Sequence, residues 1–254
     1  MKQQMEPEPI FAVRNVVLAY GSFVLMREVT FDILPGQIFV IMGGSGCGKS
    51  TLMKHLLGLI RPAEGEISYH GVPLDLEDDD QRREVLRQFG VLYQTGALWS
   101  SMSLEENISL PLQEYTNLDE DEIRKLAGLK LALVGLRGFE GFYPSEISGG
   151  MRKRAGLARA IALDPEVLFF DEPSAGLDPI SAKRLDDLIL KIRDSLGATI
   201  IIVTHELASI FAIADTCVFL DATTRRMLAQ GNPHQLLASP LNPEIRAFLT
   251  RGVA

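Results

Sequence analysis

The stretch GGSGCGKST, Gly43 to Thr51, fits the pattern G-x-x-x-x-G-K-[ST] over its first eight residues. An apolar run, Ile38 to Met42, precedes it, and a helix-like stretch, Leu52 to Leu59, follows it. A strand, a glycine-rich loop and a helix in this order are what a phosphate-binding loop requires. The glycines let backbone N–H groups point inward at a phosphate, the helix presents its positive end, and Lys49 reaches the β- and γ-oxygens. The sequence therefore predicts a nucleotide site, and a chance match in a loop is the alternative.

We expect every residue of this loop to contact the nucleotide, and Ser50 to offer its hydroxyl to Mg²⁺. The candidate nucleotide-binding residues of the loop are Gly43, Gly44, Ser45, Gly46, Cys47, Gly48, Lys49, Ser50 and Thr51.

Two acidic residues follow a second apolar run. Val167 to Phe170 is typical of a buried parallel strand, and Asp171 and Glu172 come directly after it. Asp171 suits the Mg²⁺ shell through a water molecule, and Glu172 suits the base that polarises an attacking water. Two surface acids after a strand are the plain alternative. Together with the phosphate-binding loop, the pair favours catalysis.

The segment ISGGM, Ile147 to Met151, leads into a predicted helix just before this strand. Ser148 is a predicted N-cap, because its hydroxyl can accept a hydrogen bond from the first turn. Apolar residues recur downstream at helical spacing, namely Leu157, Ala158, Ile161 and Ala162. Alone, Ser-Gly-Gly would be only a flexible turn.

On the basis of these motifs, the sequence resembles the nucleotide-binding subunits of ABC transporters over nearly its whole length. The family signature, LSGGQ, matches Ile147 to Met151 with different residues at both outer positions. Further family motifs fall at matching places. They are Tyr20 as the aromatic residue that stacks on adenine, Gln94 of the Q-loop, Ser174 to Asp178 as the D-loop, and His205 after the apolar strand Thr199 to Val203.

The resemblance implies that the protein binds ATP with Mg²⁺ and hydrolyses it. The implied catalytic residues are Lys49, Gln94, Glu172 and His205. Metal binding is implied for Ser50, Gln94 and Asp171. Beyond the loop, nucleotide contacts are implied for Tyr20, Ser148, Gly149, Gly150 and Asp178. By itself His205 would more often be a satisfied or exposed histidine.

Only one phosphate loop and one signature occur in the chain. In the family, Ser148 and Gly150 would close over ATP held by the other subunit, so the resemblance implies a homodimer with two ATP molecules between its subunits. A heterodimer with a sister ATPase stays open.

Composition limits the other classes of function. A net charge of -8 over 254 residues disfavours a nucleic-acid partner. The basic run Arg152 to Arg154 is most simply a solvated helix face. We expect the acidic run Glu77 to Asp80 to lie on a surface loop before a helix around Gln81 to Gln88, with no chemistry of its own.

The chain offers no signal for membrane insertion or for a disulfide. No apolar run approaches about eighteen residues, and the first ten residues lack the apolar core of a secretory signal. Cys47 and Cys217 lie far apart in sequence, so we expect reduced thiols. A long extension beyond Arg251 of the kind that would clasp a dimer is expected to be missing or short.

The patterns predict an α/β fold, a parallel sheet with a helical insertion. The resemblance makes this a P-loop NTPase (RecA-like) core with an antiparallel β front sheet and an inserted α-helical subdomain, the ABC ATPase fold. We expect one domain over 1–254, with the nucleotide-binding core at 9–93 and 165–230, the helical subdomain at 95–164 and a short tail at 231–254. Pro111 and Pro144 are expected to break helices.

The segment after Gln94 is the expected contact with a transmembrane permease, because in the family it forms the groove that receives a short helix of that subunit. The docking residues would be Gln94, Ala97, Leu98, Trp99 and Met102. Internal packing is the alternative, chiefly for Leu98 and Met102.

The run Tyr93 to Leu98, with Met151 ending the signature, resembles the ATPases of Mla or Mce-type phospholipid transport systems. This resemblance implies a permease and an Mce-domain lipid-binding protein as partners. It implies a location at the cytoplasmic face of the bacterial inner membrane, and movement of phospholipid or another hydrophobic substrate between the inner and outer membranes.

Two alternatives remain. One is the ATPase subunit of an ordinary importer for a polar solute. The other is a soluble ABC ATPase acting on DNA or ribosomes, although such proteins usually carry a second ATP module, a long coiled coil or zinc-binding cysteines.

Overall fold

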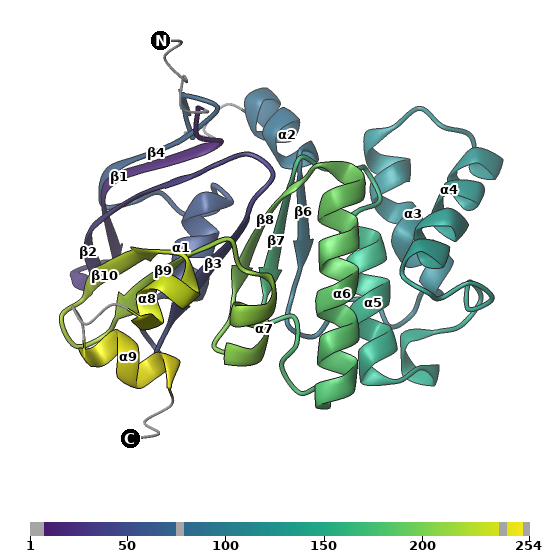
Figure 1. Ribbon diagram of the computed structural model, residues 1–254. Helices are drawn as coiled ribbons and strands as arrows, with labels where there is room; N and C mark the ends of the chain where they lie inside the picture. The colour runs from purple at the N-terminus through teal and green to yellow at the C-terminus, as the bar shows by residue number, and fades with distance from the viewer. Residues whose placement is uncertain (1–7, 75–78, 239–242, 251–254) are drawn as a thin grey trace, which may run out of the picture. The chain divides into compact units, whose positions relative to one another are not determined.

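The computed structural model of this chain describes residues 8–74, 79–238 and 243–250. The chain forms two compact units. The first unit comprises Met1–Asp79 and Ile201–Ala254, and the second comprises Asp80–Ile200. Most elements of both units are labelled in Figure 1.

The first unit begins with an antiparallel sheet. β1 (Phe11–Tyr20) pairs with β2 (Phe23–Ile33) on one side and with β4 (Glu64–Tyr69) on the other, and β5 (Val72–Pro73) extends the edge beside β4. Along β1, residues such as Phe11 and Val13 are buried, whereas Arg14 and Asn15 are exposed. The expected antiparallel front sheet is therefore confirmed.

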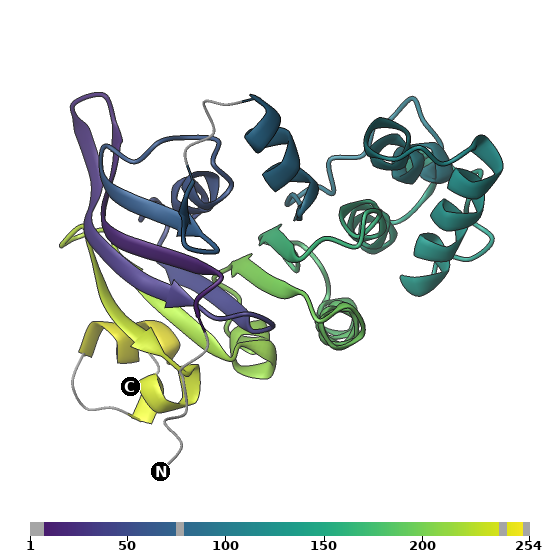
Figure 2. The same cartoon turned by 90° about the horizontal axis from the view of Figure 1, so that it is seen from above.

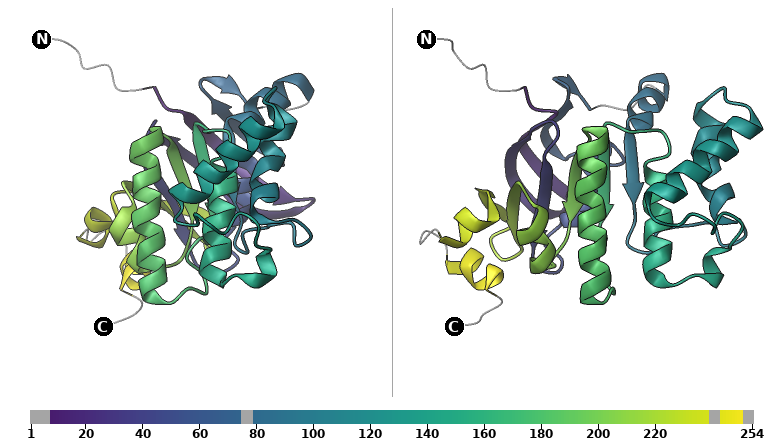
Figure 3. Two further views of the ribbon diagram at one scale, coloured as in Figure 1. Left: turned by 90° about the vertical axis from the view of Figure 1, so that its right-hand side faces the viewer. Right: turned by 45° about the vertical axis from the view of Figure 1, so that its right-hand side comes forward.

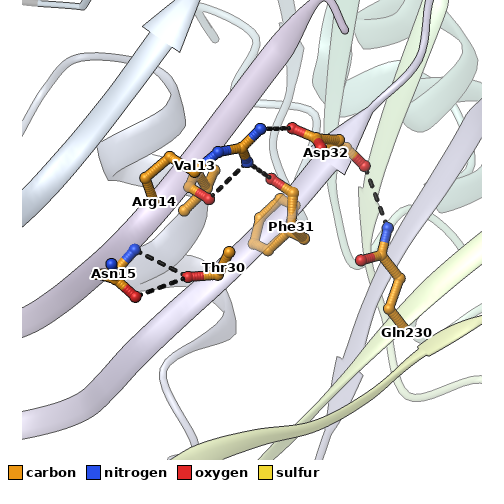
Figure 4. Close-up of polar contacts among 7 residues, drawn as sticks. All are labelled: Val13, Arg14, Asn15, Thr30, Phe31, Asp32 and Gln230. Carbon is orange, nitrogen blue, oxygen red and sulfur yellow. Dashed lines mark hydrogen bonds and ion pairs between the residues drawn. The ribbon is translucent and has the colours of Figure 1, made fainter. Parts of the chain in front are cut away.

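A polar patch on this sheet lies beside an irregular stretch of the register between β1 and β2. The Arg14 guanidinium donates to the carbonyls of Val13 and Phe31 at 3.0 and 3.2 Å and pairs with Asp32 at 2.6 Å, as Figure 4 shows. Nearby, the Asn15 N–H, in a backbone with φ 50°, donates to the Thr30 hydroxyl at 2.8 Å. Asn15 lies where the register between β1 and β2 shifts, and the Thr30 hydroxyl gives its N–H an acceptor there.

The remaining strands of the first unit carry the phosphate loop. β3 (Ile38–Gly43) is buried at every residue and runs parallel to β9 (Thr216–Asp221), and β10 (Arg226–Gly231) continues antiparallel from β9 to reach β2. Burial on both faces explains why β3 is a continuous apolar run. β8 (Thr199–Val203) ends in this unit, where the Thr204 N–H donates to the Ile41 carbonyl at 3.3 Å.

Short helices complete the first unit. α1 (Lys49–Leu56) follows the loop after β3, and α7 (Leu207–Ile213) follows β8. α8 (Pro233–Ala238) packs against α7, β10 and α9 (Pro243–Leu249); α8 and α9 are the two yellow helices of Figure 3. The C-terminal segment is thus a short helical end piece where it is described.

The second unit has two parallel strands and a set of longer helices. β6 (Phe89–Leu92) and β7 (Val167–Asp171) pair in parallel, with Leu92 opposite Phe170. The helices are α2 (Asp79–Arg87), α3 (Leu104–Tyr115), α4 (Glu120–Leu133), α5 (Gly149–Ala160) and α6 (Pro179–Leu196), with a 3-10 turn at Pro144–Glu146. α3, α4 and α5 pack on one another, and Figure 2 shows them grouped in teal.

Local signals determine where the helices of this bundle begin. Ser103 and Glu106 form a complete capping box at the start of α3, and Asp119 and Glu122 form another at the start of α4. Each box satisfies two backbone N–H groups that would otherwise lack a partner. Ser148 caps α5 as expected, and its hydroxyl accepts from the Met151 N–H at 3.3 Å.

One expectation about this bundle is wrong. Pro111 does not break a helix but lies inside α3, whereas Pro144 does open a turn. Proline removes one backbone hydrogen bond and usually disrupts a helix. Here the capping box and the burial of Ile108 and Leu112 on either side of Pro111 outweigh that loss.

The two units differ from the division expected from the sequence. β6, β7 and α6 group with the helical bundle rather than with the first unit. The boundaries expected at 95–164 and 165–230 divide the chain by predicted role, whereas the two units divide it by internal contacts. These boundaries therefore stay a prediction. Of the acidic run Glu77 to Asp80, Glu77 and Asp78 lie outside the described residues, whereas Asp79 and Asp80 form the start of α2 and not the loop that we expected. Within the described ranges, no helix is both long enough and apolar enough to cross a bilayer.

Candidate functional site

The phosphate loop in the first unit has a backbone that only glycine tolerates at key points. Gly43, Gly46 and Gly48 have φ of 151°, 75° and 95°. A Cβ atom at Gly43 would lie 2.3 Å from the Leu220 carbonyl oxygen, and one at Gly48 would lie 2.9 Å from the Leu25 side chain. These positions are therefore restricted by conformation and by space together.

Lys49 and Ser50 begin α1 at the end of this loop. The Lys49 ammonium donates to the carbonyls of Gly43 and Gly44 at 3.0 and 2.9 Å, so it lies over the loop. Ser50 is exposed, and Gly48 caps the helix without a side-chain hydrogen bond. A cation and the positive end of a helix at one loop make it suited to an anion.

Both cysteines are free thiols within the described residues, as expected. Burial raises the pKa of the Cys47 thiol, and the nearby Lys49 ammonium opposes this only in part. Burial also raises the pKa of Cys217, to about 12. Cys47 is therefore a small buried residue of the loop rather than an activated nucleophile.

The first unit places Tyr20 beside the phosphate loop. The Tyr20 hydroxyl lies 3.1 Å from the Thr51 hydroxyl, and the Tyr20 side chain is 51% exposed. An exposed ring next to the loop is available for stacking on a nucleobase.

His205 follows the end of β8 in the same unit. The preceding Thr204 is buried and hydrogen-bonded to β3, whereas the His205 side chain is 53% exposed, with Nε2 3.7 Å from a Glu206 carboxylate oxygen. The histidine therefore extends from a fixed backbone, and its role toward a nucleotide stays a prediction.

In the second unit, parallel pairing brings three predicted residues to one edge. Gln94 follows the end of β6, and Asp171 and Glu172 end or follow β7, whose Phe170 lies opposite Leu92. Gln94 is exposed and both acids are half-buried. Glu172 has φ 49°, a strained backbone for a residue other than glycine.

The basic run Arg152 to Arg154 is the solvated helix face that we expected only at Arg152, which is exposed. Lys153 is only 7% exposed, and Arg154 donates to the carbonyls of Val134 and Gly135 at 3.0 and 3.1 Å. The sequence does not indicate this arrangement. A cation that hydrogen-bonds to backbone carbonyls needs no acidic side chain as a partner, so no acidic residue in the sequence marks it.

Ser148 and Gly149 are exposed at the start of α5, and Gly150 is half-buried. A groove of about 530 Å³ beside them is lined by Ser148, Gly150 and Met151 together with Leu177, Ser181 and Arg184. The signature is therefore open to a ligand or a partner.

Asp178 is the N-cap of α6. Its carboxylate accepts hydrogen bonds from the N–H groups of Ile180 and Ser181, each at 3.0 Å. Hydrogen bonding to Ser181 lowers the pKa of its carboxyl group, so Asp178 carries a negative charge at neutral pH. Its predicted contact with a nucleotide stays a prediction.

The segment predicted to meet a permease is exposed at its tryptophan. Trp99 is 60% exposed and Ala97 is exposed, whereas Leu98 and Met102 are half-buried. Met102 lines a groove of about 360 Å³ with residues of α3 and α4 that include Ser109, Gln113 and Ile123. Trp99 is therefore not a core residue.

Two residues that the sequence analysis missed hold this segment. Asn107, fully buried, accepts from the Trp99 N–H at 2.7 Å and donates to the carbonyls of Trp99, Met102 and Ser103 at 2.9–3.1 Å. Arg159 donates to the carbonyls of Ala97 and Gly96 at 2.8 and 3.2 Å. Neither residue belongs to a motif in the sequence that would have marked it.

The residues predicted to hold Mg²⁺ offer suitable atoms. The hydroxyl of Ser50 and the carboxylate of Asp171 are hard oxygen donors, and Mg²⁺ typically takes one or two protein oxygens together with substrate phosphates and waters. Among the residues that the structure describes, no three His, Cys, Asp or Glu side chains gather as a metal cage. A magnesium that binds with the substrate fits this donor set.

Comparison with known proteins identifies the family of this chain. Residues 26–175 match the model of a family described as "ABC transporter". The chain is 42% identical over 93% of its length to the probable ribonucleotide transport ATP-binding protein mkl of Mycobacterium leprae. It is 39% identical over 91% of its length to the intermembrane phospholipid transport system ATP-binding protein MlaF of Haemophilus influenzae, and 37% identical over 93% to that of Escherichia coli K12.

The chain spans different shares of these relatives. It covers 86% and 87% of the two MlaF proteins, but about two thirds of the mycobacterial proteins, 67% of that from M. leprae and 65% of that from M. tuberculosis H37Rv.

Solved structures support the fold. CbiO1 from Clostridium perfringens, part of the ABC transporter complex cbiONQ, aligns with a TM-score of 0.83 and 27% identity, covering 97% of this chain and 96% of that one. A dimeric ATP-binding cassette in a post-hydrolysis state, bound to ADP and Pi, aligns with a TM-score of 0.79 and 27% identity, covering 87% of this chain and 98% of that one. The expected fold class is therefore confirmed.

The hydrogen bonds of Asn107 generate a prediction. Changing Asn107→Leu keeps the number of side-chain heavy atoms but removes the acceptor of the Trp99 N–H and the donor to the Met102 carbonyl, while the Trp99 and Ser103 carbonyls keep only their backbone donors. We expect a cost of about 1–3 kcal/mol in the free energy of unfolding. Urea unfolding measures the loss. The fluorescence anisotropy of Trp99, the only tryptophan in the sequence, should fall as the segment loosens.

The control for this prediction is Gln113→Leu, at an exposed position of the same helix. It should leave both readouts unchanged. Equal stability and equal anisotropy for Asn107→Leu would show that Asn107 does not hold the segment.

Proposed function

This chain belongs to the ABC transporter family, and from that premise we propose that it is the ATP-hydrolysing subunit of a membrane complex that moves phospholipid or another hydrophobic substrate. The observation that carries the proposal is the similarity to two MlaF proteins along almost the whole of both chains. The Met151 signature and the Gly96-Ala97-Leu98 segment support the same subgroup.

A second candidate is transport of a polar solute. The mycobacterial relatives, at 42% identity, bear a name that refers to ribonucleotide transport. The match to them covers a smaller share of their length than the match to the MlaF proteins. Both names describe an ATP-binding subunit of a transport system, so the two candidates differ in cargo and share the chemistry.

In the proposed reaction, the phosphate loop binds ATP. The loop N–H groups and the start of α1 hold the phosphates, and Lys49 exchanges its contacts with Gly43 and Gly44 for β- and γ-oxygens. Tyr20 stacks on the adenine from beside Thr51. Ser50, Gln94 and Asp171 would hold Mg²⁺, which when bound neutralises the phosphate oxygens.

Hydrolysis then depends on positioning, because phosphoryl transfer to water leaves little covalent chemistry to the protein. Glu172 accepts a hydrogen bond from the attacking water and orients it, with Gln94 as a second contact. His205 donates to the γ-phosphate as negative charge develops there.

We propose that the working form pairs two copies. Each copy has one phosphate loop and one signature, so Ser148, Gly149 and Gly150 of one copy would contact the ATP of the other, with Asp178 beside them. The exposure of Ser148 supports this, as does the similarity to a dimeric cassette bound to ADP and Pi. A heterodimer with a sister ATPase would use the same residues.

The docking surface for a permease would be the segment from Gln94 to Met102. Trp99 is the proposed anchor, because tryptophan is enriched at the energetic centres of interfaces and this one is 60% exposed. Binding there would place the protein at the cytoplasmic face of the bacterial inner membrane. A lipid-binding Mce-domain protein would belong to the same complex, and no nucleic acid is involved.

The role of Glu172 is tested by Glu172→Gln. This variant should hydrolyse ATP roughly 10²- to 10⁴-fold more slowly, the usual contribution of a general base, while its affinity for ATP stays unchanged. Phosphate release and equilibrium binding of a fluorescent ATP analogue are the measurements. Glu114→Gln, an exposed position on α3, is the matched control, and full activity of Glu172→Gln would remove Glu172 from the mechanism.

The pairing of two copies is tested by Ser148→Arg. The larger cation should block closure over the partner's ATP and abolish most hydrolysis, although the phosphate loop is intact and single copies still bind ATP. Ser145→Arg, an exposed position just before the signature, is the control. Normal hydrolysis by Ser148→Arg would contradict the shared site.

The cargo is tested by isolating the tagged chain gently from its native membranes. Mass spectrometry should find a permease, an Mce-type protein and bound phospholipid, and Trp99→Ala should lose all three while Leu129→Ala, 54% exposed on α4, keeps them. Recovery of a permease with a soluble solute-binding protein and no lipid would instead favour the polar solute.

A further inference from the structure

Lys153 makes a contact that no motif in the sequence indicates. It lies in α5, five residues after the N-cap Ser148, and its side chain is 7% exposed. Its ammonium donates to the carbonyls of Pro173 and Ala175 at 2.6 Å each and to that of Glu172 at 3.3 Å. All three N–H bonds of one buried ammonium therefore reach a single short turn of the backbone.

That turn is strained at the residue proposed as the base. Glu172 has φ 49°, and conformations of this kind cost about 1–3 kcal/mol and persist only where the surroundings hold them. Within the turn, the Ala175 N–H donates to the Glu172 carbonyl at 3.2 Å, and the Leu177 N–H to the Ser174 carbonyl at 3.1 Å. Ser174 is buried, and its hydroxyl has no hydrogen-bond partner among the described residues.

A buried cation without a full set of acceptors would be costly. Burial lowers the pKa of Lys153, and the Glu172 charge opposes this shift. The three carbonyls supply the acceptors that water would otherwise provide. The position therefore favours a residue that is long, flexible and able to donate three times, and those are the properties of lysine.

We propose that Lys153 is a positioning residue for the ATPase reaction: by clamping the carbonyls of Glu172, Pro173 and Ala175, it holds the Glu172 backbone in its strained conformation and so aims the carboxylate at the attacking water. This inference rests on the proposed role of Glu172. Lys153 touches the backbone of the turn and no reacting atom.

The same helix makes a second clamp of this kind. Arg159 holds the carbonyls of Gly96 and Ala97, and a Cβ atom at Gly156 would come within 2.9 Å of the Gly96 carbonyl oxygen. α5 therefore ties the segment after Gln94 and the turn after Glu172 to one rigid element that begins at Ser148. A shift of α5 would move the Glu172 backbone through the contacts of Lys153.

The clamp is tested first by kinetics. Lys153→Met keeps the apolar stem and removes all three donors, so kcat should fall about 10- to 100-fold, because a displacement of about 1 Å at a catalytic group can cost 10²-fold. KM and the affinity for ATP should change less than about twofold, because the ATP-binding residues are untouched. Lys153→Arg, which keeps the cation and its donors, should restore much of the rate, and Lys125→Met on the exposed face of α4 should match the parent.

A second readout does not depend on hydrolysis. Amide hydrogen exchange of Ala175 and Leu177, whose N–H groups are bonded within the turn, should quicken in Lys153→Met, whereas that of Ile161, bonded to Leu157 at the end of α5, should not. If Lys153→Met fails to fold, Lys153→Gln, which keeps a neutral donor, takes its place, with smaller changes expected in both readouts.

The outcomes separate the two proposals. An active parent whose Lys153 variants keep both kcat and the protection of the turn would overturn the clamp and leave the proposed function standing. An inactive parent would overturn the proposed function, and hydrogen exchange would still decide whether Lys153 holds the turn. A loss of ATP affinity equal to the loss of rate would also refute a positioning role.

Discussion

Parallel strands run with their carboxyl ends at the same edge of a sheet, and in both units the phosphate loop and the predicted catalytic residues follow such ends. In the first unit, β3 runs parallel to β9 and is continued by the phosphate loop. In the second, β6 and β7 run parallel, so that Gln94 and the Asp171-Glu172 pair leave the same edge. Because strands buried on both faces cannot carry polar side chains along their length, the loops at their ends are the places left for chemistry.

The loops are held largely through backbone carbonyls. Lys153, Arg154 and Arg159 are three cations of α5, and each donates to main-chain oxygens of a neighbouring segment. Asn107 does the same for the segment that carries Trp99. Contacts of this kind recognise the shape of a loop rather than its side chains, so the exposed side chains of the loop stay available for a nucleotide, a second copy or a membrane partner.

Glycine and strain mark the positions where these loops have a special conformation. Gly43 and Gly48 cannot accept a side chain without a clash. Glu172 and Ala97 adopt positive φ although they are not glycine, and a cation of α5 holds the carbonyl of each. Strain of this sort is stable only where other contacts maintain it, and it tends to occur where function needs one defined geometry.

The local signals in the sequence determined much of this protein. The phosphate loop, the N-cap at Ser148, the apolar strands and the position of the two acids after the β7 run could be predicted, because each depends on a few adjacent residues and on the period of a strand or helix. These motifs in order were also sufficient to recognise the family.

Only the tertiary structure decided the rest. Pro111 lies within a helix because packing on both sides outweighs one lost hydrogen bond, and Lys153 is buried because a turn some twenty residues away in sequence presents three carbonyls to it. Backbone oxygens are the same in every residue, so no pattern of side chains in the sequence could have revealed those acceptors; their positions arise only when the chain has folded.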